Sequence, residues 1–231
     1  MVPPAKVRAE KAHFLADRQM RRWELQRRSA ARPSAPAPCV ALTRLPGAGG
    51  EEIGQLVAET LDYGFFGREI VDEIARELHV DHWLVADLDE RVRGSIDRFV
   101  GDAMVEGRVT ESEYLRRLTR TIATLGRRGG AVILGRGAAY LLPPEQALRV
   151  LVVAPRSQRL ERYAKVKRLA GERAAEEFSR VEEQRSEFAR RHFGVRQDDP
   201  TLYDLVLNSA SIEIETAANL VVEALRRRFP S

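Results

Sequence analysis

The chain of 231 residues carries 38 Lys and Arg against 34 Asp and Glu, a formal net charge of +4. Its hydrophobic content of 44% suffices for a core and excludes a wholly disordered chain, and its length suits one compact domain with an appendage. The single cysteine, Cys39, excludes an intrachain disulfide and a multi-cysteine metal site.

The positive charge is concentrated at the N-terminal end. Residues 1–38 hold nine basic and three acidic residues, whereas residues 39–231 hold 29 basic and 31 acidic ones. The pattern predicts a helix over residues 6–31. Three prolines in residues 32–38 prevent its continuation, because proline lacks an amide donor and disfavours helix in the residue before it. We therefore expect a basic N-terminal helix with a Pro-rich linker over residues 1–38 and a folded domain over residues 39–231.

No apolar run approaches the roughly 20 residues that a membrane span needs, and the N-terminal end lacks the apolar core of a secretory signal. We therefore expect a cytoplasmic protein with no membrane partner. An organelle transit peptide is the alternative for the basic arm, against which Glu10, Asp17 and Glu24 argue.

After the linker, strand-like and helix-like segments alternate. The expected strands are residues 39–43, 63–66, 131–134, 148–153 and 203–207. Several of these runs are apolar without alternation, which is typical of a parallel sheet covered on both faces.

Helical spacing of apolar residues indicates the segments between the strands. The expected helices are residues 53–61, 70–78, 89–105, 110–127, 157–193 with an interruption at Gly171, and 212–229. The pattern predicts an α/β domain with three layers, in which the long charged segment 157–193 lies over the sheet as a lid.

A glycine-rich turn from Gly47 to Gly50 joins the first strand to the first helix. Glycines allow a tight turn that aims backbone amides at an anion, and the helix N-terminus adds partial positive charge. The P-loop pattern continues with Lys and then Ser or Thr, where this chain has Gly50 and Glu51. Two interpretations remain open. Either the turn cradles phosphate, with Arg44 supplying the missing cation and Glu51 a Mg²⁺ ligand, or the helix is merely capped by its own glutamates.

Five segments, in order, resemble the cytidylate kinase-like family of P-loop nucleotide kinases. They are Thr43-Arg44 with Gly47-Ala48-Gly49-Gly50 and Glu52-Ile53, Phe65-Phe66-Gly67-Arg68-Glu69-Ile70, Val132-Ile133-Leu134-Gly135-Arg136-Gly137-Ala138, residues 148–155, and Tyr203-Asp204-Leu205-Val206-Leu207-Asn208-Ser209. The resemblance implies a P-loop NTPase fold with three αβα layers, a parallel sheet of about five strands and an Arg-rich helical lid. It also implies transfer of the γ-phosphoryl group of ATP to CMP or dCMP, with Mg²⁺.

The resemblance also implies roles for individual residues. The donor phosphates would be held by Gly47, Ala48, Gly49, Gly50 and Glu51. The catalytic arginines would be Arg136 and Arg185; to these, side-chain chemistry adds Arg44 as the replacement cation and Glu51 as the metal ligand. The acceptor would be bound by Arg68, Glu69, Arg136, Arg190, Arg191 and Asn208.

The chain departs from the family pattern at Gly50, Glu51, Gly67 and Leu134, where relatives carry other, charged residues. A degenerate kinase that binds nucleotide without turnover is therefore one alternative. Another is that the basic arm binds nucleic acid or an acidic partner, against which its few aromatic residues argue. A contact between copies of the chain is an equal alternative for the arm.

Three further features have a plain and a functional interpretation. The basic residues between Arg156 and Arg168 form either a solvated helix face or part of the lid. Arg116, Arg117 and Arg120 lie either on the surface or against an acceptor phosphate. His79 and His82 have metal-like spacing, but nothing nearby completes a site.

Overall fold

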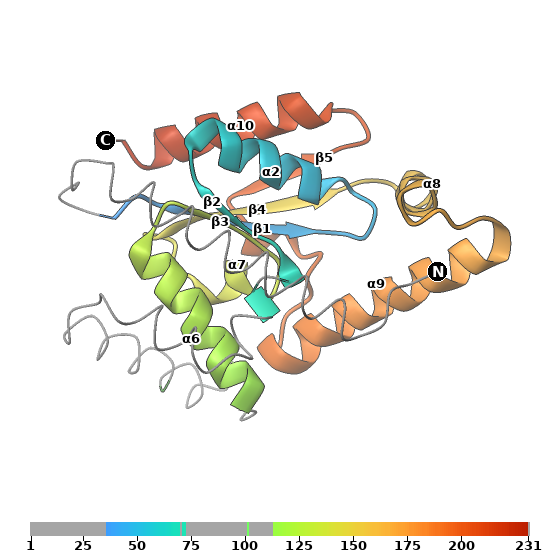
Figure 1. The fold of residues 1–231 in the computed structure, drawn as a ribbon, viewed down its shortest axis with the longest axis horizontal. Coiled ribbons are helices and arrows are strands. Elements are labelled where there is room, and N and C mark those ends of the chain that lie inside the picture. The colour runs from blue at the N-terminus through green and yellow to red at the C-terminus, as the bar shows by residue number, and fades with distance from the viewer. Residues whose placement is uncertain (1–35, 70, 73–100, 102–112, 231) are drawn as a thin grey trace.

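The computed structural model describes residues 36–69, 71–72, 101 and 113–230 (Figure 1). At its centre is a five-stranded sheet in which every pairing is parallel. The strands are β1 (Cys39–Arg44), β2 (Gly64–Phe66), β3 (Ala131–Leu134), β4 (Ala147–Val153) and β5 (Leu205–Asn208), in the order β2-β3-β1-β4-β5. The predicted parallel α/β sheet is thus confirmed, with β5 beginning two residues later than expected.

The central strand β1 lies between β3 and β4, and its register fixes which segments meet at the sheet edge. Leu42 pairs with Leu134, and Arg44 pairs with Val152, so the three strands end side by side. Because all three are parallel, their carboxyl ends and the turns that follow them lie at one edge. In this architecture ligands bind at that edge.

Helices cover both faces of the sheet, as Figure 1 shows. On one face lie α2 (Gly50–Leu61) and α10 (Ile214–Arg228), which pack on each other and bury Ile53, Val57 and Val221. On the other face lie α6 (Glu113–Arg128) and α7 (Ala138–Leu141), with Leu118 and Ile122 in the core. The expected three layers are therefore present, with an apolar core on each side of the sheet.

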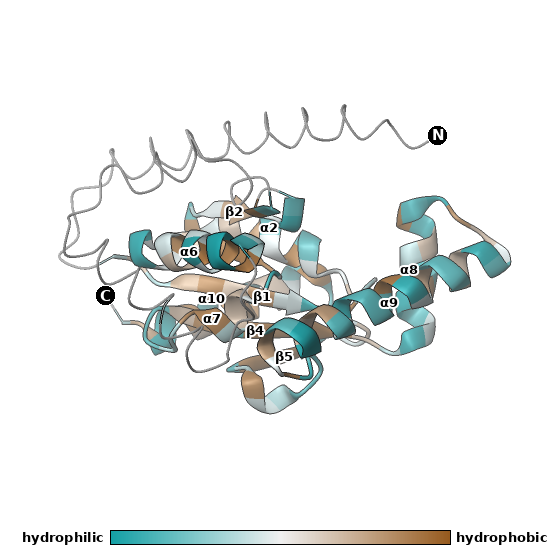
Figure 2. Ribbon diagram, turned by 90° about the horizontal axis from the view of Figure 1, so that it is seen from below, coloured by the Kyte–Doolittle hydropathy of each residue, from teal (hydrophilic) through white to brown (hydrophobic). Residues whose placement is uncertain are grey.

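The predicted charged segment folds into two helices, α8 (Arg156–Lys167) and α9 (Gly171–Phe193). Arg168 adopts a left-handed conformation and ends α8, so the interruption precedes Gly171, which begins α9. Figure 2 shows the pair extending away from the body, with largely hydrophilic residues along it. Phe193, at the end of α9, packs into the core beneath the sheet, so this end is anchored.

The last residues of the expected linker already pack on the domain. The carbonyl of Ala37 accepts a hydrogen bond from the amide of Gly130 at 3.1 Å. Residues 1–35, most of the predicted helices 70–78 and 89–105, and the pair His79 and His82 lie outside the described residues. Among the helices that are described, none has the length and apolar character to cross a membrane.

Candidate functional site

Two cavities meet at the edge where β1, β3 and β4 end. The inner cavity, of about 290 Å³, lies between the ends of β1 and β3 and helix α9. The loop cavity, of about 360 Å³, lies along the glycine turn, the first turn of α2 and helix α8. Arg44 and Arg185 line both. A group held between these two guanidiniums would therefore be reached from either cavity.

The glycine turn has a backbone that only glycine adopts without strain. Gly47 and Gly49 both have φ near 75°, in the left-handed region, and Gly49 caps the N-terminus of α2. A Cβ atom on Gly47 would lie 2.0 Å from the carbonyl oxygen of Arg159. The turn is thus packed tightly against the start of α8. Its remaining open side is the loop cavity, which a ligand can enter.

Arg44 occupies the place where the P-loop pattern would have the stem of a lysine. A Cβ atom on Gly50 would lie 2.5 Å from the Cβ of Arg44, and one on Gly135 would lie 2.7 Å from its Nη1. The side chain of Arg44 therefore runs between the glycine turn and the turn after β3. Burial, together with the nearby charge of Arg185, lowers the pKa of Arg44 to about 9, which leaves it charged at neutral pH.

Arg185 brings a second guanidinium to the same point from α9. Its Nη1 donates to the backbone carbonyl of Arg44 at 3.3 Å, and its Nε is buried without a hydrogen-bond partner among the described residues. Burial and the charge of Arg68 lower the pKa of Arg185 to about 10. Buried cations with depressed pKa values favour an anionic ligand, because the ligand would relieve their repulsion.

The far wall of the inner cavity carries Arg68 and Arg136. Burial, and then the charge of Arg136, lower the pKa of Arg68. Arg136 follows β3 in a left-handed conformation with φ of 53°, and both its Nε and its Nη2 donate to the carboxylate of Asp72. Sequence reasoning missed Asp72, although its position four residues after Arg68 on a helical segment is a signal for a charge pair.

The lid is joined to the glycine turn by a buried arginine. Arg159 is 7% exposed and donates to the carbonyls of Ala154 and Pro46 and, at 2.5 Å, to Glu182 of α9. The interpretation of the basic stretch as a solvated face is therefore wrong for Arg159. The sequence spacing could not show that Arg159 is buried and its basic neighbours are exposed, because basic residues occur on several sides of α8.

Several of the predicted site residues converge and others do not. Arg44, Arg68, Arg136, Arg185 and the segment 47–51 line one or both cavities. Those that line neither cavity are Glu69, Arg190, Arg191 and Asn208.

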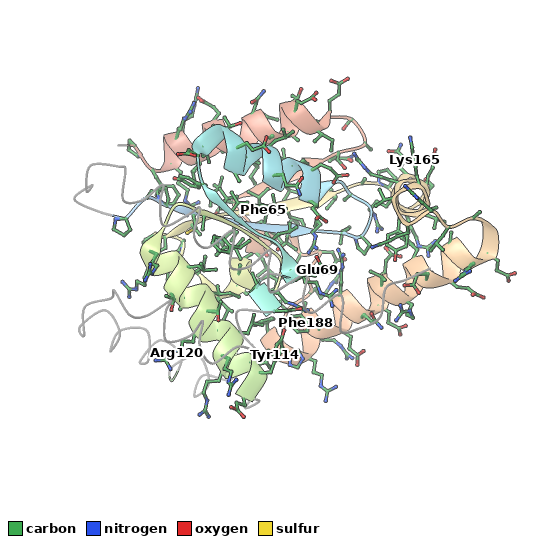
Figure 3. All side chains as sticks on the ribbon, in the orientation of Figure 1. Phe65, Glu69, Tyr114, Arg120, Lys165 and Phe188 are labelled. Carbon is green, nitrogen blue, oxygen red and sulfur yellow. The ribbon has the colours of Figure 1, made fainter. Side chains whose placement is uncertain are left out.

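Local geometry explains why these four residues lie apart. Arg190 and Arg191 follow Arg185 by five and six residues, so at about 3.6 residues per turn they lie on other sides of α9. Asn208 turns its side-chain oxygen back to the amide of Ala210. In Figure 3, Phe188 lies where α9 approaches the body, close to the segment that carries the exposed Glu69. The expected acceptor contacts of these residues gain no support from this placement.

The possible metal ligand is Glu51, an exposed carboxylate that lines the loop cavity on the first turn of α2. Within the residues that the structure describes, no three His, Cys, Asp or Glu side chains gather to hold a metal ion. Mg²⁺ commonly needs only one or two protein carboxylates beside phosphate oxygens and water, so Glu51 fits such a role.

The parallel sheet with a glycine turn after its central first strand, and a helical lid that places arginines over that turn, define a three-layer α/β protein of the P-loop kinase fold. The chain belongs to the cytidylate kinase-like family, whose model matches residues 39–211. Both findings confirm the predicted fold and family. The family implies a nucleoside monophosphate substrate and the use of ATP, usually with Mg²⁺.

Of the individual proteins compared, one is a kinase that agrees with this family and another is an isomerase that matches over a shorter segment. A cytidylate kinase of Aeropyrum pernix is 29% identical over 188 residues, which cover 79% of this chain and 96% of that protein. A uronate isomerase of Corynebacterium glutamicum is 31% identical over 119 residues, 52% of this chain, and the match spans only 23% of that protein's length. The crystal structure of an uncharacterized protein from Eubacterium ventriosum matches with a TM-score of 0.64 at 14% sequence identity. The match covers 82% of this chain and 98% of that protein, which therefore shares the fold.

Proposed function

We propose that the protein transfers the γ-phosphoryl group of ATP to CMP or dCMP, giving ADP and CDP or dCDP. The observation that carries this proposal is that Arg44 and Arg185 line both cavities. A donor in the loop cavity and an acceptor in the inner cavity would meet between these two side chains. Phosphoryl transfer needs little more than such positioning and the neutralisation of negative charge.

On the donor side, the amides of Gly47 to Gly50 and the N-terminus of α2 hold the phosphates, since three of these four residues are glycines whose amides no side chain of their own covers. Arg44 takes the role of the loop lysine and neutralises the terminal phosphates. Arg162 of α8, whose Nη1 would lie 2.7 Å from a Cβ on Gly49, adds positive charge beside the turn. Glu51 would hold Mg²⁺, which supplies charge neutralisation on the phosphate oxygens when it is bound.

On the acceptor side, Arg68 and Arg136 bind the phosphate of the monophosphate, and Arg185 bridges it to the donor. Together with Arg44, these side chains place four guanidiniums around the transferring group, where they stabilise charge in the transition state. Closure of α9 brings Arg185 to the carbonyl of Arg44 and excludes water from the reacting group.

Calorimetry on the full chain with ATP, Mg²⁺ and CMP, followed by an assay for ADP, tests the proposal. We expect ATP and CMP each to bind and ADP to form only when both are present, with dCMP, UMP, AMP and GMP as comparison acceptors. Failure of a folded protein to bind either nucleotide at millimolar concentration would reject the kinase. Binding of both without ADP formation would instead identify a degenerate kinase that senses nucleotides.

A further inference from the structure

Asp72 is the buried carboxylate at the centre of the arginines of the inner cavity. It lies on the short helical segment after β2, is 7% exposed, and accepts hydrogen bonds from two donors of Arg136. The hydroxyl of Tyr114, from α6, donates to its Oδ1 at 2.8 Å. Arg68 Nε lies 3.9 Å from its Oδ2. Asp72 thus joins segments from three separate parts of the chain at one point.

The contacts of Asp72 determine which edge of Arg136 remains available. A guanidinium has five N–H donors, and Asp72 takes the edge formed by Nε and Nη2. The ring of Phe188 covers one face of the same group, with its centroid 5.1 Å from the guanidinium carbon. The donors of Nη1 remain outside these contacts, and Arg136 itself lines the inner cavity.

The charge of Asp72 also allows two arginines to share this wall. Burial, and then the nearby charge of Arg136, lower the pKa of Arg68, and the second cause is repulsion between the two guanidiniums. A carboxylate between them offsets this repulsion and holds both side chains on one wall before any ligand binds. If Asp72 were replaced by a neutral residue, Arg136 would lose the charged partner that holds its Nε and Nη2. Repulsion would then move Arg136 away from Arg68.

We propose that Asp72 is a positioning residue for the acceptor phosphate: it holds Arg136 by Nε and Nη2 so that the Nη1 donors meet the phosphate of a phosphomonoester. This inference rests on the proposed function for the use of that phosphate. It assigns recognition in the inner cavity to the phosphomonoester group itself, because a planar guanidinium held in this way binds phosphate oxygens with defined geometry.

The molecule offers a control in a second, partly buried pair in which a carboxylate holds an arginine by two donors. Asp204 accepts from Nε and Nη2 of Arg149 and also pairs with Arg228, at 2.7 Å in the shortest contacts. Asp204 thus joins Arg149 of β4 to Arg228 at the end of α10, and none of the three residues lines either cavity. Asp204→Asn should therefore reproduce the structural cost of losing such a pair without touching the proposed acceptor site.

The experiment measures dissociation constants of CMP, ribose 5-phosphate and ATP by calorimetry on the full chain, comparing wild type with Asp72→Asn and Asp204→Asn. We expect Asp72→Asn to weaken CMP and ribose 5-phosphate about tenfold and ATP less than about twofold, and Asp204→Asn to change none of them. Unchanged or tighter CMP binding in Asp72→Asn, or equal weakening of ATP, would overturn the inference.

A double-mutant cycle tests whether Asp72 acts through Arg136. Because Arg136→Lys already loses the bidentate contact, adding Asp72→Asn to it should weaken CMP no further. Additive losses would contradict a positioning role. If Asp72→Asn does not fold, Asp72→Glu keeps the charge but displaces the oxygens, and it should weaken CMP while sparing ATP; unchanged CMP binding would reject the inference.

Ribose 5-phosphate separates this inference from the proposed function, since it carries the phosphomonoester without a base. If wild type binds ribose 5-phosphate but binds CMP no better, the proposed cytidine acceptor fails while the same variants still test Asp72. If wild type binds neither, both proposals fail.

Discussion

The side chain of Arg44 fills the space beside Gly50 that a P-loop lysine would need. A Cβ on residue 50 would lie 2.5 Å from the Cβ and 2.9 Å from the Cγ of Arg44. These atoms are close to the backbone and cannot swing away cheaply. The missing lysine and the presence of Arg44 at the end of β1 are therefore linked. The cation at the phosphate site comes from residue 44 of the strand instead of residue 50 of the helix.

Introducing the lysine should consequently harm the protein. Gly50→Lys is expected to lower the free energy of unfolding by about 1–3 kcal/mol, the usual cost of overpacking. The double variant Arg44→Gly/Gly50→Lys should recover part of this stability, because glycine removes both the Cβ and the Cγ that the new side chain would meet. Urea unfolding of the three proteins measures the effect. A Gly50→Lys protein as stable as wild type would show that Arg44 does not occupy this space.

We expect the charge of Arg44 to lower the free energy of unfolding of the ligand-free protein. Arg44→Met is expected to raise the free energy of unfolding by about 1–2 kcal/mol at pH 7 without ligand, because it removes a desolvated charge that lies near Arg185 and is only partly offset by Glu51. Its pKa in the folded protein is lowered to about 9, so the unfolded chain binds the proton more tightly. The gain is therefore full below pH 9 and shrinks as the pH rises above it.

The same Arg44→Met protein should lose ATP binding, because the donor phosphates lose their cation. Thermal unfolding from pH 7 to pH 10, with and without ATP, measures both effects. A variant that is less stable than wild type without ligand would contradict the electrostatic argument.

The two cavities should respond separately to substitutions that touch only one of them. Arg162 lines the loop cavity and Arg136 the inner cavity, whereas Arg44 lines both. We expect Arg162→Ala to weaken ATP about tenfold and spare CMP, and Arg136→Ala to do the reverse, as expected for loss of a charged hydrogen bond. Calorimetric titration of each variant with each nucleotide checks this. Equal losses for both nucleotides would refute the division into donor and acceptor sides.

The lid should depend on Glu182, which pairs with Arg156 and Arg159 across α8 and α9. Glu182→Gln is expected to loosen α9 and to lower kcat/KM about tenfold, because Arg185 would reach Arg44 less often. Glu177→Gln, which removes an exposed pair with Arg180 on the same helix, is the control and should have no effect. Limited proteolysis of α9 with and without ATP provides a second readout, and equal cleavage rates in the two variants would speak against the link.

The division of the chain near residue 38 is open to a direct test. Deletion of residues 1–35 is expected to leave ATP and CMP binding unchanged, because the described cavities are lined only by residues from 43 onward. If the basic arm binds nucleic acid, the deletion should also remove binding that weakens steeply with salt. Loss of nucleotide binding on deletion would show that the arm belongs to the site.

Much of the fold follows from local patterns. The apolar runs at Ala131–Leu134 and around Val150 became β3 and β4 as expected, since a strand buried on both faces needs apolar residues at every position. The boundary at β5 was misjudged because Tyr203 is buried and β-prone, yet it packs against α7 through Tyr140 rather than pairing in the sheet.

The candidate site could be predicted from the sequence only in part. Local sequence patterns predicted the glycine turn, the missing lysine, Arg44 at the end of β1 and Arg136 after β3, because each is defined by neighbours within a few residues. The packing of Arg44 on Gly50, the contact of Asp72 with Arg136 and the burial of Arg159 between the turn and the lid emerge only in the folded protein. The most distant of these contacts, between Arg159 and Pro46, joins residues 113 positions apart in the sequence. No local pattern encodes them, because the direction of a long charged side chain is set by the shape and charge of whatever the fold brings beside it.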